Sequence, residues 1–128
     1  IAAMAGNVGV QSSAIIVQGL ANNTIIGPVV ERLLKELSLS LLNGIILSAI
    51  LLLGSYFLLG YEIHVGYTVS IALLSVIIMA SLIGTFIPII LNKYGVDPAL
   101  ATGPFITTSN DILGILTYFT IAKIILGI

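Results

Sequence analysis

The stretch from residue 63 to residue 92, IHVGYTVSIALLSVIIMASLIGTFIPIILN, runs for 30 residues without a charged side chain, since its one histidine is counted as neutral. A transmembrane helix needs about 20 mostly apolar residues, so this stretch is long enough to cross a bilayer. Uncharged runs of 30 and 25 residues also occupy positions 1–30 and 37–61. The stretch 98–128 is similarly apolar, although Asp111 lies in its middle. The sequence therefore predicts about four spans, at residues 1–22, 37–60, 66–91 and 98–127.

The composition of the whole chain is that of a membrane-embedded protein. Of its 128 residues, 59% are hydrophobic and 7% are charged, whereas a soluble domain carries about 25% charged residues. The strands of a β-barrel would alternate apolar and polar residues, but segments such as Ile45–Leu53 are apolar on every face. The predicted fold is therefore an all-α, polytopic helix bundle in a lipid bilayer. No basic stripe is present to bind nucleic acid, and the lack of cysteine excludes thiolate metal ligation.

The polar segments between the predicted spans indicate an orientation. Residues 23–36 form a predicted cytosolic or interfacial connector, in which Gly27-Pro28 introduces a break before a short amphipathic helix. Arg32 and Lys35 lie in this connector and Lys93 lies in the third one, whereas the middle loop has no Lys or Arg. Because loops rich in basic residues stay cytoplasmic, both ends of the chain are expected to face outward.

Asp111 is the acidic residue that lies well inside a predicted span. Placing a carboxylate at mid-membrane costs at least about 2.5–3.5 kcal/mol on insertion scales, so such residues usually line a pathway or meet a partner. Helical spacing puts Gly103, Thr107 and Gly114 on the same face, with Asn110 at its margin. This small, oxygen-rich face suits a hard cation such as Mg²⁺, which is often held through one or two carboxylates with its waters retained.

Two prolines are expected to shape this span. Asp97-Pro98 is typical of a helix start, in which Asp caps the helix and Pro takes the first position. Pro104, placed inside the predicted span, is expected to leave the Leu100 carbonyl without its usual hydrogen bond. That carbonyl would add another oxygen to the environment of Asp111.

Asp111 also has structural and enzymatic alternatives. A protonated Asp111 could hydrogen-bond to Asn7 or Gln11 on a neighbouring helix, and buried amides of this kind more often tie helices together than touch a substrate. A purely structural membrane subunit is a further alternative. An intramembrane aspartyl protease would need a second acid in the same site, but Asp97 is about 14 residues and about 20 Å away, which argues against an enzyme.

Two motifs resemble those of the MgtE magnesium channels. The first is Ala5-Gly6-Asn7-Val8-Gly9-Val10-Gln11, and the second is Thr107-Thr108-Ser109-Asn110-Asp111-Ile112-Leu113-Gly114, preceded by Asp97-Pro98-Ala99 and Gly103-Pro104. The resemblance covers the whole chain and matches the last four of the family's five transmembrane helices. It implies that one helix and the cytosolic N-terminal and CBS regulatory domains lie upstream. It also implies a homodimer in the cell membrane, with its pore at the dimer interface.

The resemblance further implies roles for individual residues. The family's pore aspartate matches Asp111, where two symmetry-related carboxylates hold a hydrated Mg²⁺, and the backbone carbonyl one turn earlier matches Thr107. The residues expected to line the pore around them are Gly103, Asn110, Gly114, Asn7 and Gln11. The chain departs from the family's Gly-Gly-Asn-x-Gly-Asn-Gln motif at Ala5 and Val10. Gly103 stands where some members carry a pore-facing Asn, so selectivity among Mg²⁺, Mn²⁺, Co²⁺ and Ni²⁺ stays open.

These features lead to two hypotheses for transport. The first is passive conduction of Mg²⁺ through a pore in which two copies of Asp111 concentrate negative charge. The alternative is exchange of Mg²⁺ against Na⁺ or H⁺, as eukaryotic relatives of the family are thought to do. Proton-coupled carriers commonly contain chains of ionisable groups, and a single intramembrane acid argues mildly against coupling.

Overall fold

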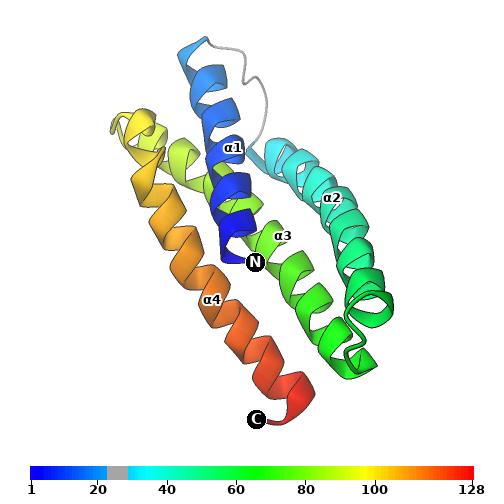
Figure 1. The fold of residues 1–128 in the computed structure, drawn as a ribbon. Helices are drawn as coiled ribbons and strands as arrows, with labels where there is room; N and C mark the ends of the chain where they lie inside the picture. Colours follow the sequence, from blue (N-terminus) through cyan, green and yellow to red (C-terminus); the bar gives the residue numbers. More distant parts are fainter. Residues whose placement is uncertain (23–28) are drawn as a thin grey trace.

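The computed structural model describes residues 1–22 and 29–128, and it folds them into helices with no strand among them (Figure 1). The elements are α1 (Ala2–Ala21), α2 (Val29–Phe57), α3 (Ile63–Lys93), the 3-10 helix η1 (Pro98–Ala101) and α4 (Pro104–Leu126). Successive α-helices run in opposite directions, so the end of α1, the start of α2 and η1 lie toward the same end of the bundle. The predicted all-α fold class is confirmed.

The central element of the bundle is α3. α1, α2 and α4 all pack against it, whereas α2 has almost no contact with any helix but α3. The buried side of α3 is rich in small residues, which allow neighbouring backbones to approach closely. At Gly84 the approach is so close that an added Cβ would collide with the Gly9 carbonyl oxygen of α1. Glycine is thus required where α1 crosses α3.

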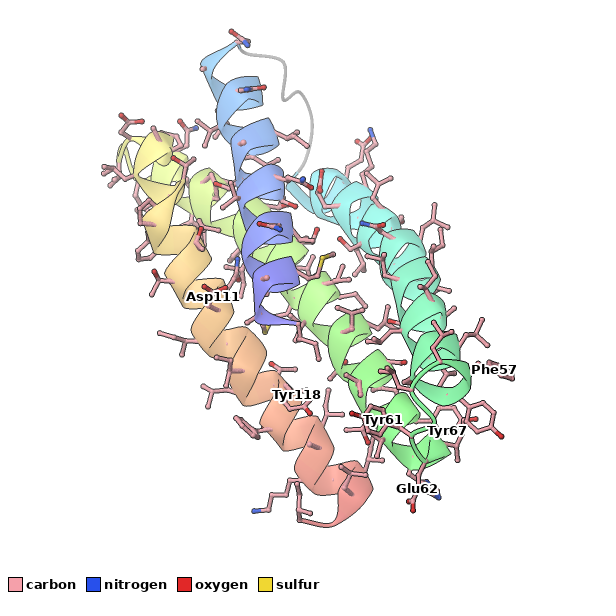
Figure 2. The ribbon with its side chains drawn as sticks, in the orientation of Figure 1. Phe57, Tyr61, Glu62, Tyr67, Asp111 and Tyr118 are labelled. Atoms are coloured by element: carbon pink, nitrogen blue, oxygen red, sulfur yellow. The ribbon has the colours of Figure 1, made fainter. Side chains whose placement is uncertain are left out.

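Three helices of the described residues are long and apolar enough to cross a membrane, over Leu34–Phe57, Ile63–Lys93 and Pro98–Leu126. α1 is 20 residues long, but its amides and serines lower its hydropathy, so the fourth span stays a prediction. At the turn between α2 and α3, the rings of Phe57, Tyr61 and Tyr67 are exposed (Figure 2). Aromatic side chains of this kind are typical of the boundary between membrane and water.

α2 begins earlier than the predicted second helix. Residues 23–28, which include the predicted Gly27-Pro28 break, lie outside the described residues. Residues 29–36 form the first turns of α2 and continue directly into 37–57, rather than forming a separate short helix. Lys35 and Glu31 make an exposed i,i+4 ion pair in these turns, with 3.3 Å between Nζ and Oε1. Such a pair supports a helix on its own surface, so charged residues here mark a helix start and not a break.

The predicted cap at Asp97 is confirmed, but it starts a different element. Its Oδ1 accepts a hydrogen bond from the Ala99 N–H at 3.0 Å, and Pro98 takes the first position. This cap begins η1, which is only four residues long. The transmembrane helix α4 starts separately, after Gly103.

The expectation about Pro104 is wrong. Gly103 has φ 63° and ψ −133°, a conformation that favours glycine and interrupts the helix, and Pro104 occupies the first turn of α4. No continuous α-helix joins Leu100 to Pro104, so Pro104 does not take a helical hydrogen bond away from the Leu100 carbonyl. The interruption instead presents the Gly103 carbonyl to the first turn of α4, where the Thr107 N–H donates to it at 3.0 Å.

Candidate cation site on α4

Asp111 lies about two turns into α4, half-buried on the side that faces α1 (Figure 2). Gly6 of α1 lies beside it, since a Cβ added at Gly6 would lie 3.0 Å from Asp111 Oδ1 and 3.2 Å from Thr107 Cγ2. α1 therefore passes Asp111 with its backbone and no side chain in between. The space that glycine leaves at this crossing is occupied by the carboxylate.

Thr107 lies one helical turn before Asp111, and its hydroxyl is already committed. Its Oγ1 donates a hydrogen bond to the Gly103 carbonyl oxygen at 3.1 Å. The hydroxyl proton is thus used, and only acceptor lone pairs remain on Oγ1. A helical carbonyl such as that of Thr107 also keeps a second lone pair after it accepts its i+4 hydrogen bond. Thr107 and Asp111 together present oxygen acceptors along one side of α4.

Asn110 and Gly114 lie inside the bundle. Asn110 is 0% exposed, and within the described part of the chain neither its Oδ1 nor its Nδ2 has a hydrogen-bond partner. An added Cβ at Gly9 of α1 would collide with Asn110 Nδ2. A Cβ at Gly114 would lie 3.3 Å from the Cβ of Ala5, so this position is also part of the contact between α1 and α4. These two residues set how closely α1 approaches Asp111.

Asn7 and Gln11 are exposed on α1, and Gln18 is exposed on the same side of the helix, nearer its end. These three amides are called the amide stripe below. Among the described residues, no hydrogen bond or ion pair reaches the Asp111 carboxylate, so Asn7 and Gln11 do not hold it within one chain. Unsatisfied amides are costly to place against lipid. The amide stripe is therefore expected to face water or another protein surface.

Within the described residues, Asp111 does not belong to a cluster of metal-ligating side chains. No group of three or more His, Cys, Asp or Glu side chains comes together in the described residues. Mg²⁺ requires near-octahedral oxygen coordination but keeps several of its waters. One copy can offer the Asp111 carboxylate and the Thr107 carbonyl, so the other ligands would have to be waters or groups of a second copy.

The sequence places Glu36 in the polar connector, but the structure places it in α2 with its side chain buried, at 7% exposure. Its backbone carbonyl accepts hydrogen bonds from Ser40 Oγ at 2.7 Å and from Ser81 Oγ of α3 at 3.5 Å. The signal that could have revealed it is the spacing of Glu36, Ser40 and Asn43 at i, i+4 and i+7, which places three polar residues on one helix face.

Comparison with known sequences identifies the family of this chain. The sequence profile of the MgtE family, described as a divalent cation transporter, matches residues 1–121. The chain belongs to the MgtE family. The resemblance noted in the two sequence motifs is thereby confirmed. Together with the apolar helices, membership makes this chain part of a multi-pass membrane protein.

Three relatives in this family carry the name magnesium transporter MgtE. The chain is 39% identical to the protein of Bacillus subtilis, over 95% of this chain and 27% of the relative. It is 34% identical to that of Thermus thermophilus, over 94% of this chain and 27% of the relative. It is 36% identical to that of Enterococcus faecalis, over 93% of this chain and 26% of the relative. The chain thus spans about a quarter of the length of these MgtE proteins.

Proposed function

We propose that this chain forms the cation pathway of a Mg²⁺ transporter, and that Mg²⁺ passes through it by passive conduction at the interface of a homodimer. The observation that carries the proposal is Asp111, a half-buried carboxylate in the middle of the apolar span Pro98–Leu126 with no hydrogen-bond or ion-pair partner in the described chain. Such a group is costly unless a cation or water reaches it. The names of the MgtE relatives point to Mg²⁺ as that cation.

A second copy would complete the site. In a two-fold dimer the same face of α4 meets itself, so two Asp111 carboxylates and two Thr107 carbonyls would converge. Two carboxylates balance the charge of one divalent cation, whereas a monovalent cation would leave them repelling each other. Selectivity for divalent ions would then follow from the charge and size of the site. Mn²⁺, Co²⁺ and Ni²⁺ would be separated from Mg²⁺ mainly by hydration and size.

The amide stripe supports a water-filled path along α1. Asn7 follows Gly6 directly, so the stripe passes Asp111 at the level where α1 and α4 cross. Amide groups can hydrogen-bond to the waters that Mg²⁺ retains. In this arrangement Asn7 and Gln11 would line the approach to Asp111, while Asn110 and Gly114 would hold the two helices together behind it.

A coupled mechanism is the second candidate, and Glu36 favours it. A single intramembrane acid argues mildly against coupling, but Glu36, in the first turn of the span Leu34–Phe57, is also buried in the bundle. A second buried acid could bind a proton or Na⁺ while Asp111 binds Mg²⁺.

The two mechanisms differ in how Mg²⁺ flux responds to other gradients. The full-length protein is reconstituted in liposomes, and Mg²⁺ uptake is compared with that of Asp111→Asn and of a control, Glu62→Gln, at an exposed acid in the α2–α3 turn. Loss of the carboxylate charge should lower Mg²⁺ uptake at least about tenfold, and Glu62→Gln should not change it. Uptake that ignores Na⁺ and pH gradients supports conduction, and uptake that requires either gradient supports coupling. Undiminished uptake by Asp111→Asn would refute the proposed pathway.

A further inference from the structure

A polar cavity lies between α1, α2 and α3, on the side of the bundle away from α4. α1 and α2 both pack on α3 but have little contact with each other, and the cavity fills the wedge between them. Its volume is about 160 Å³. Six of its lining residues are polar, namely Gln11, Ser12, Glu36, Ser40, Asn43 and Ser81. In a chain with 7% charged residues, such a concentration of polar groups in the bundle requires an explanation.

The hydroxyl groups of this cavity have already used their protons. Ser12 donates to Ser81 Oγ at 3.4 Å, and Ser81 donates in turn to the Glu36 carbonyl oxygen at 3.5 Å. Ser40 donates to the same carbonyl at 2.7 Å. Each serine oxygen therefore faces its surroundings with acceptor lone pairs, and an ionised carboxylate has acceptors alone. Apart from the amide N–H groups of Gln11 and Asn43, the polar side chains of the cavity therefore offer acceptors, which suits a guest that donates hydrogen bonds and carries positive charge.

The cavity is separate from Asp111. Gly6 of α1 faces Asp111, and a rotation of about 100° per residue places Val8, Ser12 and Ile15, which line the cavity, roughly 120–180° around the helix from Gly6. α1 therefore stands between the two sites. Gln11 belongs both to the cavity lining and to the exposed amide stripe. Water that reaches the amide stripe can therefore also reach the cavity.

We propose that this cavity binds a hydrated divalent cation, held through the Glu36 carboxylate and the oxygens of Asn43 and Gln11. At about 30 Å³ for each water in the liquid, the cavity of about 160 Å³ has room for about five waters, which is comparable in size to the octahedral shell of oxygens around Mg²⁺. A carboxylate has about four lone-pair positions, so Glu36 can accept from the cation's waters and keep protein partners as well.

This second site does not depend on conduction through Asp111, so it is tested with Asp111 removed. Full-length protein carrying Asp111→Asn is purified, and binding of Mn²⁺ is measured from the loss of the electron paramagnetic resonance signal of free Mn²⁺. Adding Glu36→Gln should remove one Mn²⁺ site per chain or weaken it by about 10- to 100-fold, the range found for groups that hold a metal through its outer contacts. Adding Glu62→Gln should leave that site unchanged.

A second measurement covers the case in which Glu36→Gln does not fold. Crystals of the Asp111→Asn protein soaked in Mn²⁺ should give an anomalous difference peak between α1, α2 and α3, near Glu36 and Asn43. Equal Mn²⁺ binding by the Glu36→Gln and Glu62→Gln variants would overturn the proposal, and so would the absence of a peak in the cavity. Failure of the Asp111 pathway would appear in the flux assay and would leave this result untouched.

Discussion

Replacing Gly9 by alanine should separate α1 from α4 and destabilise the bundle. The added Cβ would collide with Asn110 Nδ2 and would lie 3.0 Å from Ile106 Cγ2. Asn110 and Ile106 are both 0% exposed, so neither side chain can swing into open space. Overpacking of this kind costs about 1–3 kcal/mol, whereas alanine gains up to about 1 kcal/mol over glycine in a helix. After a gain of about 1 kcal/mol, the expected net loss is up to about 2 kcal/mol.

Gly54 in α2 provides the matched control, since an added Cβ there would meet no atom within 4 Å. Both substitutions gain the same helix propensity, so the difference between them isolates the collision at Gly9. Reversible unfolding in mixed detergent micelles, followed by circular dichroism, should place Gly9→Ala about 1–3 kcal/mol below Gly54→Ala. A Gly9→Ala protein as stable as Gly54→Ala would refute the close packing of α1 on α4.

Two further substitutions test the surroundings of Asp111. Gly6→Ala adds a Cβ 3.0 Å from Asp111 Oδ1, the end of a flexible side chain that can shift, so liposome uptake of Mg²⁺ should fall severalfold while stability stays close to that of Gly54→Ala. Unchanged uptake would show that the carboxylate does not need its place beside α1. Gly103→Ala forces a side chain into φ 63° and ψ −133°, which should cost about 1–3 kcal/mol in the same unfolding assay. Wild-type stability of this variant would contradict the break before α4.

Hydropathy predicts the helices well where apolar residues run without charge, and poorly at helix ends. The predicted helix 66–91 lies within α3, whose ends at Ile63 and Lys93 differ from it by a few residues. Hydropathy does not reveal the start of α2, because it falls where the first charged residues appear. Two of these residues, Glu31 and Lys35, nevertheless form an ion pair that stabilises the helix. The start of α4 was missed because it depends on the backbone conformation of Gly103, which composition does not reveal.

The candidate site was predicted in part. Helical spacing brings Thr107 and Asp111 to one side of a helix, and the structure agrees that both face Gly6. Spacing within one helix cannot reveal which helix lies opposite, so the role of Gly6 could not be derived from the sequence. Asn110 was placed at the margin of the polar face, but the approach of Gly9 buries it completely.

The polar character of α1 follows from what surrounds it. Its glycine side packs against α3 and α4, its Ser12 side contributes to the cavity next to α2, and its third side is the amide stripe. A hydropathy scale assumes lipid around the helix, and none of these three sides requires lipid contact. α1 therefore falls short as a membrane span by composition, although protein and water can satisfy each of its sides within a bilayer. In a dimer that faces the amide stripe toward a water-filled path, α1 is the helix expected to be least apolar.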